Sequence, residues 1–117
     1  VNSTRLRGYT RHASGVVELT YTLGAGDYTD SVWRMLILTF DKSLGSDRAK
    51  LYLDDTQIAQ GNAFAEDIVA GDEGLVLGRY GANDFTGDIA LLVVESKTWS
   101  SSEVTYWYNQ ERHLFGV

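Results

Sequence analysis

The sequence predicts an antiparallel β-sandwich that closes with a short C-terminal helix. Glycine is frequent, with 12 residues, and proline is absent. Aromatic and β-branched residues recur in short blocks, a composition that favours strands. Glycine- and aspartate-rich pieces separate these blocks and are typical of turns. Short strands at this spacing indicate two stacked layers of antiparallel strands.

Each predicted strand is a block of apolar, β-branched or aromatic residues bounded by turn residues. The expected strands are residues 16–23, 32–41, 49–53, 57–59, 64–69, 75–77 and 89–95. The pair Asp54–Asp55 separates KLYL from TQIA as a tight hairpin turn does. Aspartate tolerates the left-handed backbone of such a turn, although glycine fits it better.

The end of the chain carries the one good helix start. Ser100 is followed by two serines and Glu103, the spacing of a capping box, in which each side chain bonds the backbone N–H of the other residue. Val104, Trp107 and Tyr108 follow at helical spacing and predict about one or two amphipathic turns. We expect Trp107 to anchor this helix on the sandwich.

The bulk properties predict one domain over residues 1–117 and exclude several classes of partner. The chain has no cysteine, which excludes disulfides and thiolate metal sites. Its formal charge of −6 argues against a nucleic-acid or anionic-membrane partner. No apolar run is long enough to insert into a membrane, and Val1 opens no recognisable signal peptide. Arg5, Arg7 and Arg11 are interpreted as a solvated arm or as partners for the acidic excess.

Three segments carry a resemblance to a known family. They are VWRMLILTFD at 32–41, KLYLDDTQIAQG at 50–61 and GDIALLVVESKTWSSSEVTYWYN at 87–109. In order and spacing they resemble the tryptophan-led strand, the hairpin and the closing strand with helical tag of laminin G-like domains, members of the concanavalin A-like lectin and glucanase superfamily. The resemblance covers about residues 31–110 and implies a jelly-roll sandwich.

Departures from that family bear on the metal site and on the sheet. The family usually has aspartate where this chain has Ala90, and glycine where it has Asp55. The strand pair before the tryptophan-led strand is shorter than in full members. Two interpretations stay open: the N-terminal strands are abbreviated, or another chain completes the sheet.

Both faces of two predicted strands are apolar. Side chains alternate along a strand between its two faces. Leu36, Leu38 and Phe40 are therefore expected on one face, and Trp33, Met35 and Ile37 on the other. We expect Leu36 and Leu92 to share the interior. A large apolar side chain left in water forgoes roughly 1.5–3 kcal/mol, so the outer set needs cover. The residues predicted to form an interface are Trp33, Met35, Ile37, Leu91 and Val93.

The cover for this apolar surface has two possible sources. The first is intramolecular: the terminal helix, the N-terminal arm, or a curved sheet packed on both faces. The second is another copy of the chain or a neighbouring domain. The sequence therefore predicts a homo-oligomer or a domain contact as an alternative to a self-contained fold.

The sequence lacks the patterns of a catalytic site. Glycosidases of the resembled superfamily use acidic residues that alternate on one strand, so that two carboxylates face one cleft. Glu66 and Asp67 are adjacent and would point to opposite faces, and Glu95 stands alone. His12 and His113 lie near the two ends and are interpreted as surface or packing residues. We therefore predict that the chain is not an enzyme.

Two oxygen-rich turns could hold calcium, a hard cation that takes oxygen ligands. They are DKSLGSD at 41–47 and GANDFTGD at 81–88, and the candidate ligands are Asp41, Asp47, Asp84 and Asp88. The competing interpretation is that these residues only shape turns. No cofactor is required by either interpretation.

Two loops combine aromatic rings with planar hydrogen-bonding groups, the combination that suits sugar rings. The candidate ligand-binding residues are Tyr28, Arg79, Tyr80, Asn83 and Asp84. Tyr80 could instead plug the end of the sandwich. The predicted function is a non-catalytic recognition or adhesion module that binds glycans or protein surfaces through its rim loops, outside the cell, at a cell surface or on a virion. The runner-up is a structural subunit that self-associates, and a polysaccharide hydrolase is a remote third.

Overall fold

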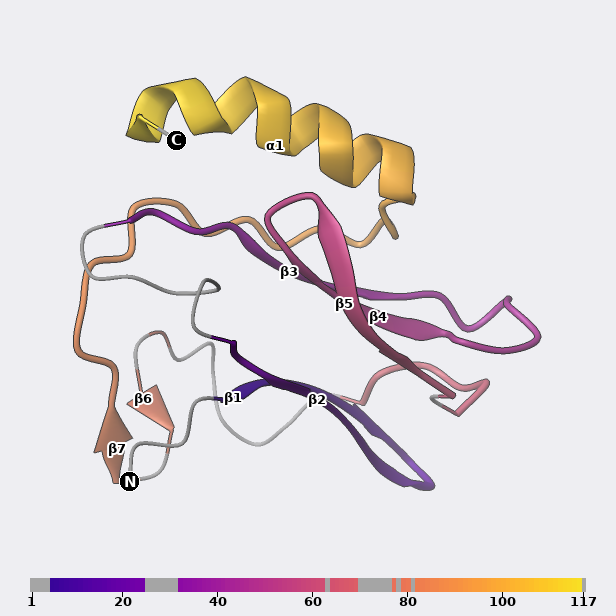
Figure 1. Ribbon diagram of the computed structural model, residues 1–117. Helices are drawn as coiled ribbons and strands as arrows, with labels where there is room; N and C mark the ends of the chain where they lie inside the picture. The colour runs from indigo at the N-terminus through magenta and orange to yellow at the C-terminus, as the bar shows by residue number, and fades with distance from the viewer. Residues whose placement is uncertain are drawn as a thin grey trace.

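The computed structural model describes residues 5–24, 32–62, 64–69, 77, 79–80 and 82–116. Within them the chain forms antiparallel sheets and one C-terminal helix (Figure 1). The elements are β1 (Arg5–His12) paired with β2 (Gly15–Thr22), β3 (Leu36–Phe40), β4 (Ala49–Leu53) and β5 (Thr56–Gly61) in one sheet in that order, β6 (Arg79–Tyr80) paired with β7 (Asn83–Asp84), and α1 (Ser101–Phe115).

The N-terminal arginines lie on a strand. Along β1, residues 5, 7, 9 and 11 are exposed, while Gly8, Thr10 and His12 are buried. This is the alternation of a half-buried strand, so the interpretation as a solvated arm is wrong. The interpretation as partners for acidic residues is confirmed for Arg7, whose Nε lies 3.4 Å from Glu18 Oε1 on β2.

The predicted hairpin at Asp54–Asp55 is confirmed. Asp54 has a φ of 57°, the left-handed conformation that this turn requires. Its carboxylate accepts hydrogen bonds from the backbone N–H of Met35 at 3.0 Å and from Arg34 at 2.6 Å. Its own N–H donates to the carbonyl of Met35 at 2.7 Å. The β4–β5 turn is thereby fixed to the residues that lead into β3.

The β1–β2 hairpin packs on one face of the β3–β4–β5 sheet, and the core lies between them (Figure 1). Leu19 on β2 and Leu51 on β4 are 4% and 1% exposed. The layers approach closely at glycines: a Cβ on Gly8 would lie 3.0 Å from Leu38 Cδ1, and one on Gly61 would lie 2.8 Å from Leu19 Cδ2. Larger residues at these two positions would push the layers apart.

Helix α1 lies on the opposite face of the same sheet (Figure 1). Tyr52, next to Leu51 and therefore on the other face of β4, is 1% exposed. Near the C-terminal end of α1, Phe115 packs on Trp33 with ring centroids 5.2 Å apart. The sheet is therefore covered on both faces, by the hairpin and by the helix.

The helix begins as predicted but continues further. The Ser100–Glu103 capping box is formed, and the helix runs for 15 residues to a left-handed Gly116. The helix is longer than the one or two turns expected, because packing on a sheet stabilises helical turns beyond those that the sequence pattern marks. The predicted anchor is also wrong: Val104 is fully buried, whereas Trp107 is 38% exposed.

His12 is a packing residue, as predicted. It is 2% exposed and lies between Phe40 and Phe64, at centroid distances of 4.9 and 5.6 Å. Its Nδ1–H donates to the carbonyl of Glu66, and its Nε2 accepts from Thr10. Both ring nitrogens are thus used to hold the segment 64–69 against β1.

Two predicted strands are not strands. Residues 64–69 form a single bridge, His12 to Ile68, to which the bond from the Val69 N–H to the Arg11 carbonyl belongs. Residues 89–95 belong to no strand. A strand is defined by its pairing with another strand. Residues 89–95 make no backbone hydrogen bond to a described residue. Of the predicted strand 75–77, only residue 77 is described.

Leu36 and Leu92 do not share an interior, contrary to expectation. They are 52% and 46% exposed. Leu92 lies in the unpaired stretch, and Leu36 is the first residue of β3. The interior instead centres on Leu19, Ala49 and Leu51.

Candidate functional site

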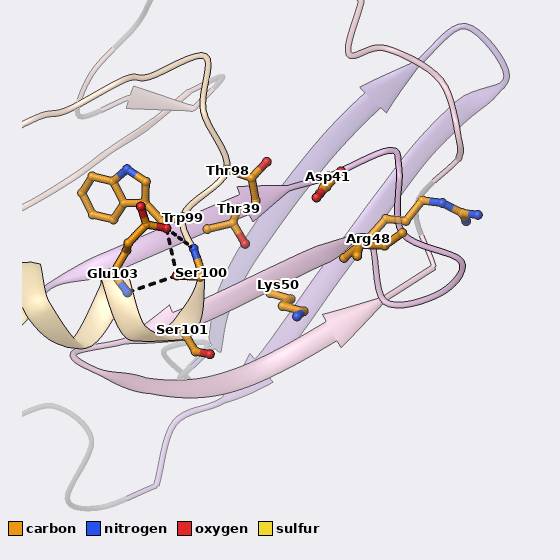
Figure 2. A pocket seen from close by; sticks show the side chains of 10 residues that line it. Thr39, Asp41, Arg48, Lys50, Thr98, Trp99, Ser100, Ser101 and Glu103 are labelled. Carbon is orange, nitrogen blue, oxygen red and sulfur yellow. Dashed lines mark hydrogen bonds between the residues drawn. The ribbon is translucent and has the colours of Figure 1, made fainter.

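A cleft of about 290 Å³ lies where the start of α1 meets the ends of β3 and β4 (Figure 2). Its walls come from β3 and the turn after it, from β4, and from the residues that lead into the helix. The lining residues are Thr39, Asp41, Leu44, Arg48, Lys50, Thr98, Trp99, Ser100, Ser101 and Glu103. Most of them carry hydroxyl or charged groups, although more than half of the exposed lining surface is apolar.

Thr39 and Lys50 face each other across the β3–β4 pair and contribute the sheet side of the cleft. Thr39 is 7% exposed, and Lys50 is half-buried. Lys50 has no ion pair or hydrogen bond to the residues that the structure describes. Its ammonium group is therefore available to a ligand.

The turn from Asp41 to Arg48 forms one rim. The Asp41 carboxylate accepts from the N–H of Ser43 at 2.9 Å and from its hydroxyl at 2.6 Å. These bonds lower the pKa of Asp41, with a smaller contribution from the charge of Lys50. The Arg48 guanidinium donates to the carbonyl of Gly45 at 3.1 Å. Asp41 is thus ionised at neutral pH and can accept hydrogen bonds from hydroxyl groups.

The start of α1 forms the other rim. The Ser100 N–H and hydroxyl both donate to Glu103 Oε2 at 2.8 Å, and Ser100 Oγ accepts from the Glu103 N–H at 3.3 Å. Lys97 donates to the second oxygen of the same carboxylate. The bond from Lys97, followed by those from Ser100, lowers the pKa of Glu103 to about 2. Glu103 is therefore ionised near neutral pH, where its carboxylate caps the helix and holds no exchangeable proton.

Trp99 closes one end of the cleft. Its ring stacks on Trp107 with centroids 5.4 Å apart and planes 9° from parallel, and its Nε1–H donates to Glu95 at 2.6 Å. In Figure 2 the ring lies on the far side of Glu103 from Asp41. The hydroxyl of the neighbouring Thr98 donates to the carbonyl of Phe40. These contacts fix the strand-to-helix connection against the edge of β3.

The ligand-binding residues predicted from the sequence are placed only in part. Tyr28 lies outside the described residues. Arg79 and Tyr80 pair with Asp84 and Asn83 as the short strands β6 and β7, whose backbones alone are described. The four residues are thus brought together on one two-stranded turn, as a shared loop requires.

The predicted calcium ligands are separated. Asp41 bonds to Ser43, and Asp47, at a φ of 51°, donates its N–H to Asn62 Oδ1 at 2.7 Å. Both therefore act as turn residues in this structure. Asp88 is exposed, and the side chain of Asp84 is outside the described part. Among the described residues, no three His, Asp or Glu side chains gather at a spacing that could hold a metal ion.

The predicted interface residues fall into two groups. Trp33, Met35 and Ile37 lie on the sheet face that α1 covers, and Met35 and Ile37 are half-buried. Leu91 and Val93 are 57% and 51% exposed. Trp33 packs on Phe115 of α1 but is still 36% exposed, whereas Leu91 and Val93 remain open to solvent.

Sequence reasoning missed the cleft itself. Lys50 lies on β4, whereas Thr98 and Ser101 lie where the chain enters α1, and only the packing of α1 on the sheet brings the two segments together. One signal was present: Lys50 is the single charged residue in the strand AKLYL, which is otherwise apolar apart from a tyrosine. A charge within a buried strand points to an opening to solvent on that face.

Comparison with known proteins finds no match to a family model, a curated protein or a solved structure. No helix within the described ranges is long and apolar enough to cross a membrane.

Proposed function

We propose that the chain is a non-catalytic recognition module of the laminin G-like jelly-roll type, acting outside the cell, and that it binds a glycan in the cleft at the start of α1. The observation that carries the proposal is the half-buried Lys50, which has no hydrogen bond or ion pair to a described residue, in a cleft that also holds the hydroxyl groups of Thr39 and Ser101. The resemblance to lectin-superfamily domains supports the same class of ligand.

The chemistry of the lining suits a sugar. Hydroxyl groups of Thr39 and Ser101 can both donate and accept, as sugar hydroxyls do. Lys50 donates, and Asp41 accepts. A volume of about 290 Å³ lies near the lower end of small-molecule sites, roughly 300–1,000 Å³, which suits a terminal sugar unit. The cationic Lys50 favours an acidic sugar over a neutral one.

The two carboxylates of the cleft support binding over hydrolysis. A glycosidase needs a general acid that keeps its proton near the working pH. Glu103 has a pKa of about 2, and the pKa of Asp41 is also lowered. Neither group can protonate a leaving oxygen at neutral pH.

A glycan array followed by calorimetry on the best ligand tests this proposal. Lys50→Met removes the charge but keeps the length of the side chain, and we expect it to weaken binding about tenfold or more, the worth of one hydrogen bond to a charged group. The matched control is Lys42→Met, which removes an exposed lysine paired with Asp67 and should leave affinity unchanged. A wild-type chain that binds no glycan, or an equal affinity for both variants, would contradict the proposal.

The residues of the β6–β7 turn define a competing site for the same ligand. If the β6–β7 turn binds the glycan instead, Tyr80→Ala and Asp84→Ala will abolish the response and Lys50→Met will not. Calcium held by Asp84 at that turn would then strengthen binding. The two sites are therefore separated by the same calorimetric experiment with three variants.

A second function, self-association as a structural subunit, is favoured by a different observation. Every side chain from Ile89 to Val94 is exposed, although all are apolar. Solution mass against concentration, measured by light scattering, tests this function directly. A strictly monomeric mass at high concentration would contradict it.

A further inference from the structure

The segment Ile89–Val94 is the most apolar exposed stretch among the described residues. Its least exposed large side chain is Ile89, at 45%, and its most exposed is Val94, at 74%. No hydrogen bond joins these residues to another described residue. In Figure 1 the segment runs as an open trace that forms no ladder with a described strand. An apolar stretch with free backbone donors and acceptors is a template for strand pairing.

We propose that this segment pairs with the same segment of a second copy of the chain, antiparallel, about a two-fold axis at Leu92. The proposal rests on the second function above, self-association, and is independent of the cleft. It names the surface, the partner and the register. Each is open to a separate measurement.

The sequence of the segment is self-complementary in this register. Directly opposed residues of an antiparallel pair point to the same face, so a two-fold axis must place a residue opposite its own copy. With Leu92 opposite Leu92, Leu91 faces Val93 and Ala90 faces Val94. Aliphatic side chains thus meet aliphatic side chains on both faces, which stabilises a strand pair.

The charged residues that flank the segment are compatible with this register. Asp88 lies opposite Ser96, and Glu95 lies opposite Ile89. No charge faces a like charge, which would destabilise the pair. Shifting the axis to Leu91 places Asp88 opposite Val94, and shifting it to Val93 places Lys97 opposite Ile89. The register centred on Leu92 places the two copies of Ala90–Val94 opposite each other, with Glu95 opposite Ile89 at each end.

The exposed area fits a weak dimer. These side chains expose on the order of 500 Å² of apolar surface per copy, as much as the largest patch on a typical monomer. Edge-to-edge pairing covers only part of this surface, so the area removed from water on two copies stays below roughly 1,000 Å², the lower limit for a stable specific interface. We therefore expect association in the micromolar range. Because each copy carries a net charge of −6, added salt should strengthen it.

Sedimentation velocity on two variants tests the partner and the register. Leu92→Lys and Leu92→Glu each place like charges together at the axis, so each should be monomeric at concentrations where the wild-type chain doubles its mass of 13.0 kDa. Mixed in equal amounts, they place Lys opposite Glu and should form a heterodimer. The matched control is Leu114→Lys on α1, where the side chain is 73% exposed and the dimer should persist.

The outcomes separate this proposal from its alternatives. A wild-type chain that stays monomeric at high micromolar concentration overturns it and leaves a strand of another protein as the cover. A dimer that survives Leu92→Lys, or variants that do not pair when mixed, overturns the register. Melting temperatures matched to wild type show that the variants fold. Lys50→Met should leave the dimer intact, so failure of the glycan proposal would not affect this one.

Discussion

Strand β4 and the segment Ile89–Val94 are both short and largely aliphatic, yet they lie at opposite extremes of burial. Ala49, Leu51 and Tyr52 on β4 are at most 1% exposed, whereas Ile89 to Val94 are exposed throughout. The difference lies in their partners. β4 is flanked along the chain by β3 and β5, each a short turn away, and has cover on both faces. The later segment has no partner strand nearby in sequence, and closing a long loop onto a distant one costs conformational entropy.

The contrast shows that apolar pattern and burial are separate properties. A pattern of alternating aliphatic residues sets the propensity of a segment to pair. Whether it pairs depends on a hydrogen-bonding edge within reach. For β4 the chain itself supplies two edges, and for Ile89–Val94 we infer that a second copy supplies one.

The largest expected effect comes from replacing one leucine by alanine in each of the two regions. Leu51→Ala removes buried methyl groups from the core and should lower the free energy of unfolding by about 2–5 kcal/mol. Leu91→Ala removes exposed methyl groups and should change it by less than about 0.5 kcal/mol in dilute solution. Urea titration of both variants checks the comparison. Similar losses for the two would show that Leu91 is buried.

A smaller effect is expected where the β1–β2 hairpin touches the sheet. Gly61→Ala places a Cβ 2.8 Å from Leu19 Cδ2. Relieving that overlap should destabilise the fold by about 1–3 kcal/mol. Gly45→Ala is the control, since a Cβ there meets nothing within 4 Å. Equal stability of the two variants in thermal melts would mean that the layers are further apart than described.

The smallest effect concerns the pH dependence of the helix start. The pKa of Glu103 in the folded chain is about 2, below its ordinary value of 4.5. A lowered carboxyl pKa contributes stability above the unfolded value, and the contribution is lost as pH falls from about 4.5 to about 2. Glu103→Gln keeps the cap but not the charge, so it should flatten the stability curve in that window. A wild-type curve that the substitution leaves unchanged would rule out this charge as the cause.

Local signals in the sequence predicted local structure well. The Ser100–Glu103 cap and the Asp54–Asp55 hairpin each depend on residues within a few positions, and both formed. Strand β1 was missed although its period-two alternation is visible, because three arginines near the start of the chain were interpreted as an arm. The information needed was the position of Glu18 on the neighbouring strand, which only pairing reveals.

Features that depend on distant segments could not be predicted in this way. The cleft requires Lys50 on β4 to meet the start of α1, and no periodicity encodes that contact. The aliphatic run at 89–95 was predicted to be a strand and forms none here, because composition does not say which edge a segment joins. For the same reason the register proposed for two copies had to be argued from opposed side chains.

Amide hydrogen exchange at two protein concentrations tests the central claim most directly. Amides of Leu51 and Tyr52 on β4 should exchange slowly at both concentrations. Amides from Ile89 to Val94 should exchange rapidly in dilute solution and become protected as the chain is concentrated. Protection of Ile89–Val94 equal to that of β4 in a dilute, monomeric sample would contradict the account, since the segment would then already have its partner within one chain.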